Sequence, residues 1–255
     1  AGVLAASMLF TGCSKKAESK VPDKLIVGTN AEFPPFEYMN DKKQPEGFDI
    51  AMIKEIGKRM GKKVEIKNME FKSLIGAMES DSINAIIAGM TKTEKREKAV
   101  DFSDSYYTTN QAIILKKDSK ITKLAQLDGK KIGVQEGTTG DLISSGDKFG
   151  DGKKAKVLVK GAKVKRFKKG VDAVMDLKNG SVDAVVIDEL TANEFVKKNA
   201  KKLKLVIDSA GSEYYCIALT KGNTAYKEEV NKQIKAIKED GTYDKLKAKY
   251  IDSKN

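Results

Sequence analysis

Residues 84–103 read NAIIAGMTKTEKREKAVDFS, and this stretch shows the structural unit from which the whole chain is built. The apolar run at 84–90 has the composition of a buried β-strand, and the charged segment at 93–100 is predicted to be a helix. Arg96 falls in the first turn of that helix, where the positive end of the helix dipole favours anions over cations. The position of Arg96 therefore suggests that a negatively charged group binds nearby.

The same alternation of strands and helices is found on the N-terminal side of this stretch. Strands are predicted at 24–29 and 63–71, because both runs are apolar or alternate and are bounded by Gly or polar residues. The segment 47–61 has apolar residues at helical spacing, an Asp near its start and a Gly at its end. A short helix is expected at 73–80. Strand–helix alternation of this kind favours a parallel sheet with helices on its faces.

On the C-terminal side, a long β-rich run at 106–118 interrupts the alternation, and a second alternating set occupies 130–207. A further β-rich run at 212–221 leads to two closing helices. This order predicts an α/β protein with two lobes, each a mainly parallel sheet flanked by helices, joined by a two-stranded hinge. The predicted lobes are lobe 1, residues 24–110 plus 211–255, and lobe 2, residues 111–210. Ligands prefer the cleft between such units, at the ends of parallel strands.

Composition excludes several classes of function. The chain has 255 residues with no His or Trp, and its cysteines are Cys13 and Cys216. Without His, and with so few Cys, neither a zinc site nor a His-based catalytic triad is expected. The net charge is +12, but the lysines are spread through every predicted helix and loop, without the interleaved aromatics of a stacking platform. We therefore expect a solvated lysine-rich surface and no nucleic-acid partner.

The N-terminal residues AGVLAASMLFTGC (1–13) resemble the end of a bacterial lipoprotein signal peptide. In this interpretation 1–12 is the remnant of the signal, and Cys13 carries the lipid, although Phe10 departs from the Leu usual at its position. Residues 13–23 are polar and predict a flexible tether. The alternative is a buried apolar strand. No apolar run here is long enough to span a bilayer as a helix.

Polar loops follow several predicted strands and should meet at one cleft. In the loop after the first strand, Phe33 is a candidate for a pocket wall, whereas Phe36 is expected in the core. Thr91 and Glu94 have the spacing of a capping box. The loop QEGTTG (135–140) is not a phosphate loop, because it lacks the Gly-Lys-Ser/Thr pattern. Its backbone N–H groups are nevertheless candidates to contact an anion.

Two charged residues suggest the class of ligand. Arg96 in one lobe needs a carboxylate, although a surface pair with Glu94 or Asp101 is an alternative. Asp188 follows an apolar strand in the other lobe, and a carboxylate buried there needs a cationic partner. A small molecule that carries a carboxylate and an ammonium close together is an α-amino acid.

Six motifs of this sequence resemble the polar amino-acid-binding proteins of bacterial ABC importers, over about residues 24–251. They are GTNAEFPPFEY, GFDIAMIKEIG, AGMTKTEKREKAVDFS, GKKIGVQEGTTG, VDAVVIDE and EDGTYDKLKAKY. The resemblance implies a type II periplasmic-binding-protein fold outside the cytoplasm, lipid-anchored to the membrane at Cys13. It also implies a monomer without cofactor or metal that closes on a free L-amino acid and delivers it to a membrane permease. The lysine-rich segment 148–167 is longer than usual for the family.

The resemblance also implies a role for each matching residue. Arg96 would bind the α-carboxylate, with Thr91 and the Gly89 backbone beside it, and Thr139 would add hydrogen bonds from the second lobe. Asp188 would bind the α-ammonium. The remaining positions concern the ligand side chain. Phe33 and Phe71 would sandwich it between their rings. Asn30, Glu32 and Gln135 would set the specificity for it.

The identity of the amino acid stays open between two groups. The stretches IGVQEGTTG and SEYY are most similar to binders of basic amino acids, which favours arginine or lysine. Asn30 stands where such binders often have Asp, so glutamine or another polar amino acid is the alternative. Two further alternatives share the fold: a subunit that reports to a chemoreceptor, and a dehydratase of cyclic acids that would use Glu32 as general acid.

Overall fold

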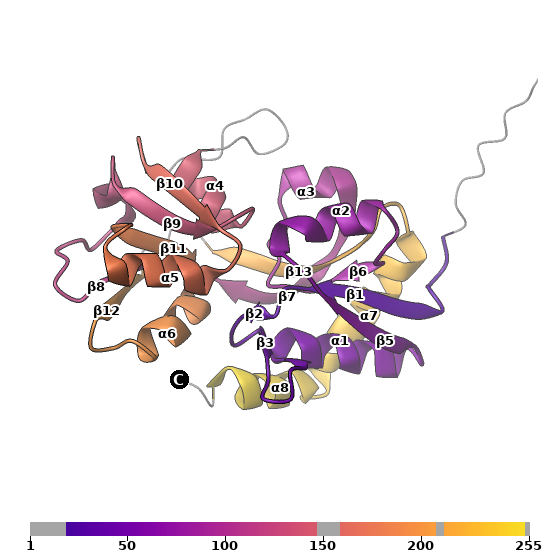
Figure 1. The fold of residues 1–255 in the computed structure, drawn as a ribbon. Helices are drawn as coiled ribbons and strands as arrows, with labels where there is room; N and C mark the ends of the chain where they lie inside the picture. The colour runs from indigo at the N-terminus through magenta and orange to yellow at the C-terminus, as the bar shows by residue number, and fades with distance from the viewer. Residues whose placement is uncertain (1–18, 147–158, 208–211, 253–255) are drawn as a thin grey trace, which may run out of the picture.

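The structure is a computed structural model that describes residues 19–146, 159–207 and 212–252, and it contains two five-stranded sheets side by side (Figure 1). The first has the order β5-β1-β6-β13-β7, and the second has the order β10-β9-β11-β8-β12. We call the first sheet with its helices lobe 1 and the second with its helices lobe 2. The predicted α/β fold with two mixed, helix-flanked sheets is confirmed, but the sheets are not mainly parallel, because each has two parallel and two antiparallel pairings.

In lobe 1, β1 pairs in parallel with β5 and β6, and β13 pairs antiparallel with β6 and β7. A small sheet of β2, β3 and β4 follows β1. The bounds are β1 Lys24–Thr29, β2 Glu32–Phe33, β3 Glu37–Met39, β4 Pro45–Glu46, β5 Lys63–Asn68, β6 Ala85–Ile86, β7 Val100–Thr109 and β13 Glu213–Thr220.

In lobe 2, β9 pairs in parallel with β10 and β11, and β8 runs antiparallel between β11 and β12. The chain passes from lobe 1 to lobe 2 at Asn110, between β7 and β8, and it returns between β12 and β13. The bounds are β8 Gln111–Lys116, β9 Lys131–Gln135, β10 Lys163–Phe167, β11 Ala184–Asp188 and β12 Leu203–Ile207.

The helices cover the faces of the two sheets (Figure 1). Lobe 1 carries α1 Phe48–Arg59, α2 Leu74–Glu79, α3 Glu94–Ala99, α7 Thr224–Glu239 and α8 Thr242–Tyr250, and lobe 2 carries α4 Thr139–Ser145, α5 Gly170–Asn179 and α6 Glu189–Lys197. Short 3-10 turns occur at Phe71–Ser73 and Leu124–Leu127. In α1 the apolar positions Ile50, Ile53 and Ile56 are all buried, as their helical spacing predicts. None of the helices within the described ranges has the length and apolar character needed to cross a membrane.

The residues before α3 differ from the prediction in one respect. The prediction of a capping box at Thr91 and Glu94 is wrong, because Thr93 is the N-cap of α3. Its Oγ1 accepts a hydrogen bond from the Arg96 N–H at 3.3 Å. Thr91 is instead in an extended bridge with Tyr215. The helix therefore starts two residues later than the capping box requires, and this leaves the Thr91 hydroxyl for another partner.

The start of the described chain lies against α7. The Ser19 hydroxyl accepts a hydrogen bond from the Ala225 N–H at 2.8 Å, and the Asn223 side chain donates to the Lys20 carbonyl at 2.8 Å. These contacts fix the last part of the expected tether. Cys13 and the expected signal remnant lie outside the described residues.

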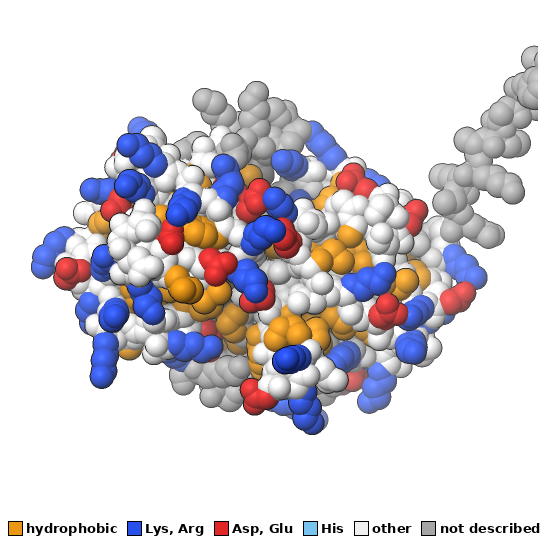
Figure 2. Space-filling view, in the orientation of Figure 1, with side chains coloured by type: hydrophobic (Ala, Val, Ile, Leu, Met, Phe, Trp, Pro, Cys, Tyr) orange, Lys and Arg blue, Asp and Glu red, His pale blue; other side chains and the backbone are white. Residues whose placement is uncertain are grey.

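Lysine and arginine side chains are spread over the visible face of both lobes, with acidic side chains between them (Figure 2). They do not gather into one basic stripe on this face. Cys216 is buried in β13, and burial raises the pKa of its thiol to about 11. This placement agrees with a structural role for the thiol.

Candidate functional site

The two lobes enclose a small cavity, with free space of about 10 Å³, at the place where groups from both lobes meet. Its walls combine two aromatic rings with polar groups from both lobes. The lining residues are Asn30, Phe33, Phe71, Ala88, Gly89, Thr91, Arg96, Gln135, Thr138, Thr139 and Asp188. Every residue predicted to contact the ligand is in this set except Glu32. Ala88 and Thr138 were not predicted.

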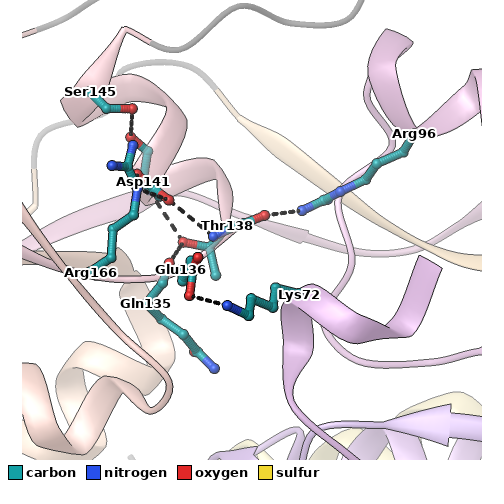
Figure 3. Close-up of polar contacts among 9 residues, drawn as sticks. Lys72, Arg96, Gln135, Glu136, Thr138, Asp141, Ser145 and Arg166 are labelled. Carbon is teal, nitrogen blue, oxygen red and sulfur yellow. Dashed lines mark hydrogen bonds and ion pairs between the residues drawn. The ribbon is translucent and has the colours of Figure 1, made fainter. Parts of the chain in front are cut away.

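Arg96 reaches across the cleft from α3. Its Nη2 donates to the Gly137 carbonyl of lobe 2 at 2.9 Å (Figure 3). Its Nη1 donates to the Thr91 carbonyl. The side chain is buried, and burial lowers its pKa to about 10, so the guanidinium stays charged at neutral pH. The alternative of a surface ion pair with Asp101 is wrong, because Asp101 pairs with Lys221 at 3.0 Å instead. A guanidinium has five N–H donors, and the described bonds use two of them.

The loop of lobe 2 that meets Arg96 is held by its own hydrogen bonds. The Asp141 carboxylate accepts from the Gly137 N–H at 3.0 Å and from Arg166 Nε at 2.9 Å (Figure 3). Thr138 caps α4, with its Oγ1 accepting from the Asp141 N–H at 3.3 Å. Gly137 has a φ of +80°, which strains any residue with a Cβ. These contacts fix the direction of the Gly137 carbonyl.

Asp188 lines the same cavity as Arg96, at the point where β11 ends and α6 begins. Its carboxylate accepts hydrogen bonds from Gln111 Nε2 at 2.5 Å and from the Tyr215 hydroxyl. Burial, with the nearby negative charge of Glu213, raises the pKa of Asp188 to about 7. The buried carboxylate has no basic side chain in direct contact among the described residues, so a ligand ammonium would supply the missing counter-charge.

The remaining wall is aromatic and amide in character. The guanidinium carbon of Arg96 lies 5.3 Å from the centre of the Phe71 ring, a cation–π distance. Gln135 Nε2 donates across the cleft to Asn30 Oδ1 at 2.8 Å, and the Asn30 amide donates to the Met69 carbonyl at 2.8 Å. The Gln135 side-chain oxygen is buried without a hydrogen-bond partner among the described residues. A donor group on a ligand would satisfy this acceptor.

Gly89 lets the aromatic wall approach the backbone. Its φ is +52°, and a Cβ there would lie 3.2 Å from the Phe33 ring and 3.3 Å from the Tyr215 ring. Its N–H donates to Asp49 Oδ2 at 2.7 Å, and Tyr106 donates to the same oxygen at 2.7 Å. Asp49 therefore positions a loop that lines the cavity.

Glu32 lies outside the cavity lining and takes part in a set of contacts across the rim of the cleft. Its Oε1 is 2.7 Å from Lys169 Nζ of lobe 2. Two similar pairs lie at the rim, one between Glu70 and Lys168 at 2.6 Å and one between Lys72 and Glu136 at 2.9 Å (Figure 3). Glu32 is thus already paired with a cation of the protein.

Sequence reasoning missed several residues that support the site: Asp49, Gln111, Thr138 and Tyr215. Thr138 and Tyr215 lie inside quoted motifs, so the motifs marked the loops but not the individual contacts. Asp49 was noted only as an acidic residue at a helix start. No local sequence pattern marks Gln111 as part of the site, because its contact with Asp188 joins residues 77 positions apart in the chain.

Comparisons with known proteins give matches over most of the chain. A family model described as bacterial extracellular solute-binding proteins, family 3, matches residues 25–253. The arginine-binding extracellular protein ArtP of Bacillus subtilis is 34% identical over 243 residues, covering 94% of this chain and 91% of ArtP. A solved structure described as an ancestral arginine-binding protein bound to arginine has a TM-score of 0.82 and 42% identity, covering 91% of this chain and 100% of that one. One described as bound to glutamine has the same TM-score and identity, covering 91% of this chain and 99% of that one.

Proposed function

The chain belongs to the bacterial extracellular solute-binding proteins of family 3, and from this membership we propose that it is the amino-acid-binding component of an ABC importer. The observation that carries the proposal is the arrangement of charge in the cavity. Arg96 of lobe 1 and Asp188 of lobe 2 line the same enclosed space. A zwitterionic α-amino acid complements both, with its carboxylate toward Arg96 and its ammonium toward Asp188.

For the side chain of the ligand we propose arginine first and glutamine second. The side-chain end of the cavity offers neutral acceptors on Asn30 and Gln135, next to the Phe33 and Phe71 rings. A guanidinium is planar, stacks on aromatic faces and is more weakly hydrated than an ammonium. The ammonium of lysine would need a carboxylate, and Glu32 is already paired with Lys169. The amide of glutamine also has N–H donors, so glutamine is the second candidate.

The proposed mechanism follows from the split site. In an open form each lobe offers half of the site to water, whereas a bound amino acid bridges both halves. Because the ligand has more affinity for the closed form, binding shifts the protein toward closure, and the closed form is recognised by the permease. We further propose that the protein acts as a monomer outside the cytoplasm, held at the membrane by lipid on Cys13.

The alternatives on the same fold are less favoured. A dehydratase needs a further cavity carboxylate, besides Asp188, as general acid. The only candidate from the sequence, Glu32, is outside the lining set and is paired with Lys169. We therefore propose a binding protein and not an enzyme. A chemosensory subunit would use the same site for the same ligand.

A thermal-shift screen of the proteinogenic amino acids tests the proposal, with protein that has been unfolded and refolded to remove carried-over ligand. A ligand that binds only the native state adds about 2.7 kcal/mol to the free energy of unfolding at a concentration 100 times Kd. It therefore raises Tm. We expect the largest shift with L-arginine and a smaller one with L-glutamine. If no amino acid raises Tm, the proposal is wrong. A prephenate-like cyclic acid, followed for aromatic product, is the control for the enzyme alternative.

A further inference from the structure

Glu213 joins the two lobes behind the cavity. It is the first residue of β13 in lobe 1, and a single carboxylate oxygen, Oε2, accepts two hydrogen bonds. One comes from the Thr91 hydroxyl of lobe 1 and the other from the Thr139 hydroxyl of lobe 2, each at 2.7 Å. Both threonines line the cavity, whereas Glu213 lines a separate surface hollow that Thr91 shares. The carboxylate therefore binds two hydroxyls that line the cavity without lining the cavity itself.

These hydrogen bonds fix which way the hydroxyls point. A threonine hydroxyl has one proton and two lone pairs, and a carboxylate only accepts. The Thr91 and Thr139 hydroxyls therefore both donate their proton to Glu213, so that only their lone pairs are left for other partners. Gln111 Nε2 uses one lone pair of Thr139, at 3.2 Å, and the same amide donates to Asp188. The chain of contacts thus runs from Thr91 through Glu213 to Asp188.

The consequence concerns the two ends of the ligand backbone. Hydroxyls that present lone pairs attract N–H donors and repel carboxylate oxygens. The Glu213 charge acts in the same direction, because it adds to the negative potential around Asp188. Without Glu213, each hydroxyl is free to rotate and donate to an anion.

On the basis of the proposed amino-acid-binding function, we propose that Glu213 is a positioning residue for the ligand site. Its carboxylate ties Thr91 to Thr139 across the cleft, which stabilises the closed form. It also turns both hydroxyls so that the site requires an α-ammonium group on its ligand. Glu213 thereby contributes to selection of α-amino acids over acids that lack the amino group.

The test uses isothermal titration of the full chain with L-arginine, L-glutamine and the deaminated analogue 5-guanidinopentanoate. The variants are Glu213→Ala and the isosteric Glu213→Gln. In Glu213→Gln the side-chain oxygen still accepts hydrogen bonds, but the NH2 group donates them. Glu70→Gln is the matched control, because it removes an acid that also contacts lobe 2 but lies at the rim, paired with Lys168. The unliganded Tm of each variant reports whether the fold is retained.

We expect Glu213→Ala to weaken L-arginine binding about tenfold. The variant loses two hydrogen bonds to a charged group, and water partly replaces them. The preference for L-arginine over 5-guanidinopentanoate should fall by a further factor of about ten, with a smaller fall for Glu213→Gln. Glu70→Gln should leave that preference unchanged. A merely structural role for Glu213 would lower Tm and affinity but not the preference between the two ligands.

Two results would overturn the inference in distinguishable ways. If the wild type binds amino acids and both Glu213 variants keep the wild-type preference against the deaminated analogue, Glu213 is not a positioning residue, and the proposed function stands. If the wild type binds neither L-arginine nor L-glutamine nor any other amino acid in the thermal screen, the proposed function fails and the inference fails with it.

Discussion

The charged end of the cavity, where Arg96 and Asp188 lie, and the side-chain end, formed by Asn30 and Gln135 with two phenylalanine rings, hold their polar groups in different ways. At the charged end, buried ions bind to carbonyls, an amide and a hydroxyl of the protein. At the side-chain end, two neutral amides bind to each other across the cleft. Removing a buried charge from its partner costs about 2–5 kcal/mol, whereas a neutral hydrogen bond contributes about 0.5–1.5 kcal/mol.

The difference separates affinity from selectivity. The charged end recognises what every α-amino acid shares, so changes there should affect all ligands equally. The side-chain end has weaker contacts that vary with the ligand, so changes there should alter the ranking of ligands more than the total affinity. The four predictions below test this division, from the largest expected effect to the smallest.

Arg96→Ala should weaken the binding of every amino acid, because it removes the cation that meets the α-carboxylate. We expect Kd to rise at least about 100-fold for L-arginine and L-glutamine alike, by isothermal titration. Arg59→Ala is the control, since Arg59 pairs with Glu55 and Asp240 away from the cavity. A change of less than tenfold for Arg96→Ala would show that the carboxylate binds elsewhere.

Asp188 should make binding depend on pH. Its pKa is about 7 without ligand, because burial and Glu213 favour the protonated form. An ammonium ligand needs the ionised form, so binding must release a proton wherever Asp188 is protonated, which is below about pH 7. We expect Kd to rise by up to about tenfold for each pH unit below that value and to be flat above it.

Titration calorimetry in buffers of different ionisation enthalpy, between about pH 5.5 and 8, counts the released proton directly. Asp188→Asn is the control, and it should bind weakly at every pH with no proton release in this range. Tighter binding at the acidic end for the wild type would contradict the sign of this prediction.

Asn30→Asp should change the ranking of ligands. A carboxylate at this position supplies the counter-charge that lysine lacks in the present cavity, so lysine should gain about tenfold relative to glutamine. The substitution also removes the donor to the Met69 carbonyl, so Tm without ligand should fall. Asn30→Ser, which removes the amide without adding charge, is the control. An unchanged ranking in competition binding would place the ligand side chain away from residue 30.

Glu32→Gln should have the smallest effect, a change in Kd of less than about threefold for any ligand. The family resemblance implies a role for Glu32 in side-chain specificity, but the side chain forms a partly exposed ion pair with Lys169, and such pairs contribute about 0–1 kcal/mol. Lys169→Gln is the matched variant and should have the same effect. A selective loss of arginine binding in Glu32→Gln alone would restore Glu32 to the site.

The order of strands and helices could be predicted well because it depends on local patterns. The buried run at 84–90 and the charged segment after it contain β6 and α3, and the spacing of Ile50, Ile53 and Ile56 identified α1. The helix start was harder, because Thr91 and Thr93 are both acceptable N-caps by type. Pairing of Thr91 with Tyr215, far along the chain, leaves Thr93 as the cap.

The two charged residues of the cavity could also be predicted from the sequence, for a physical reason. A cation in the first turn of a helix and an acid at the end of an apolar strand are both unfavourable without a partner, so Arg96 and Asp188 were conspicuous. Asn30 and Gln135 carry no such conflict in the sequence. Only the resemblance to a family marked them.

What the sequence by itself determined is the α/β order of the chain, the two-lobed arrangement and the charges that suit an α-amino acid. What only the tertiary structure decided is which acidic side chains are available to a ligand. Glu32 is paired because the folded chain brings Lys169 beside it, Glu213 is turned toward two threonines, and Asp188 alone of these acids lines the cavity. Local sequence patterns indicate the cost of burying a charge, but the partners that offset the cost are distant in the sequence or lie in the opposite lobe, and only the folded chain brings them together.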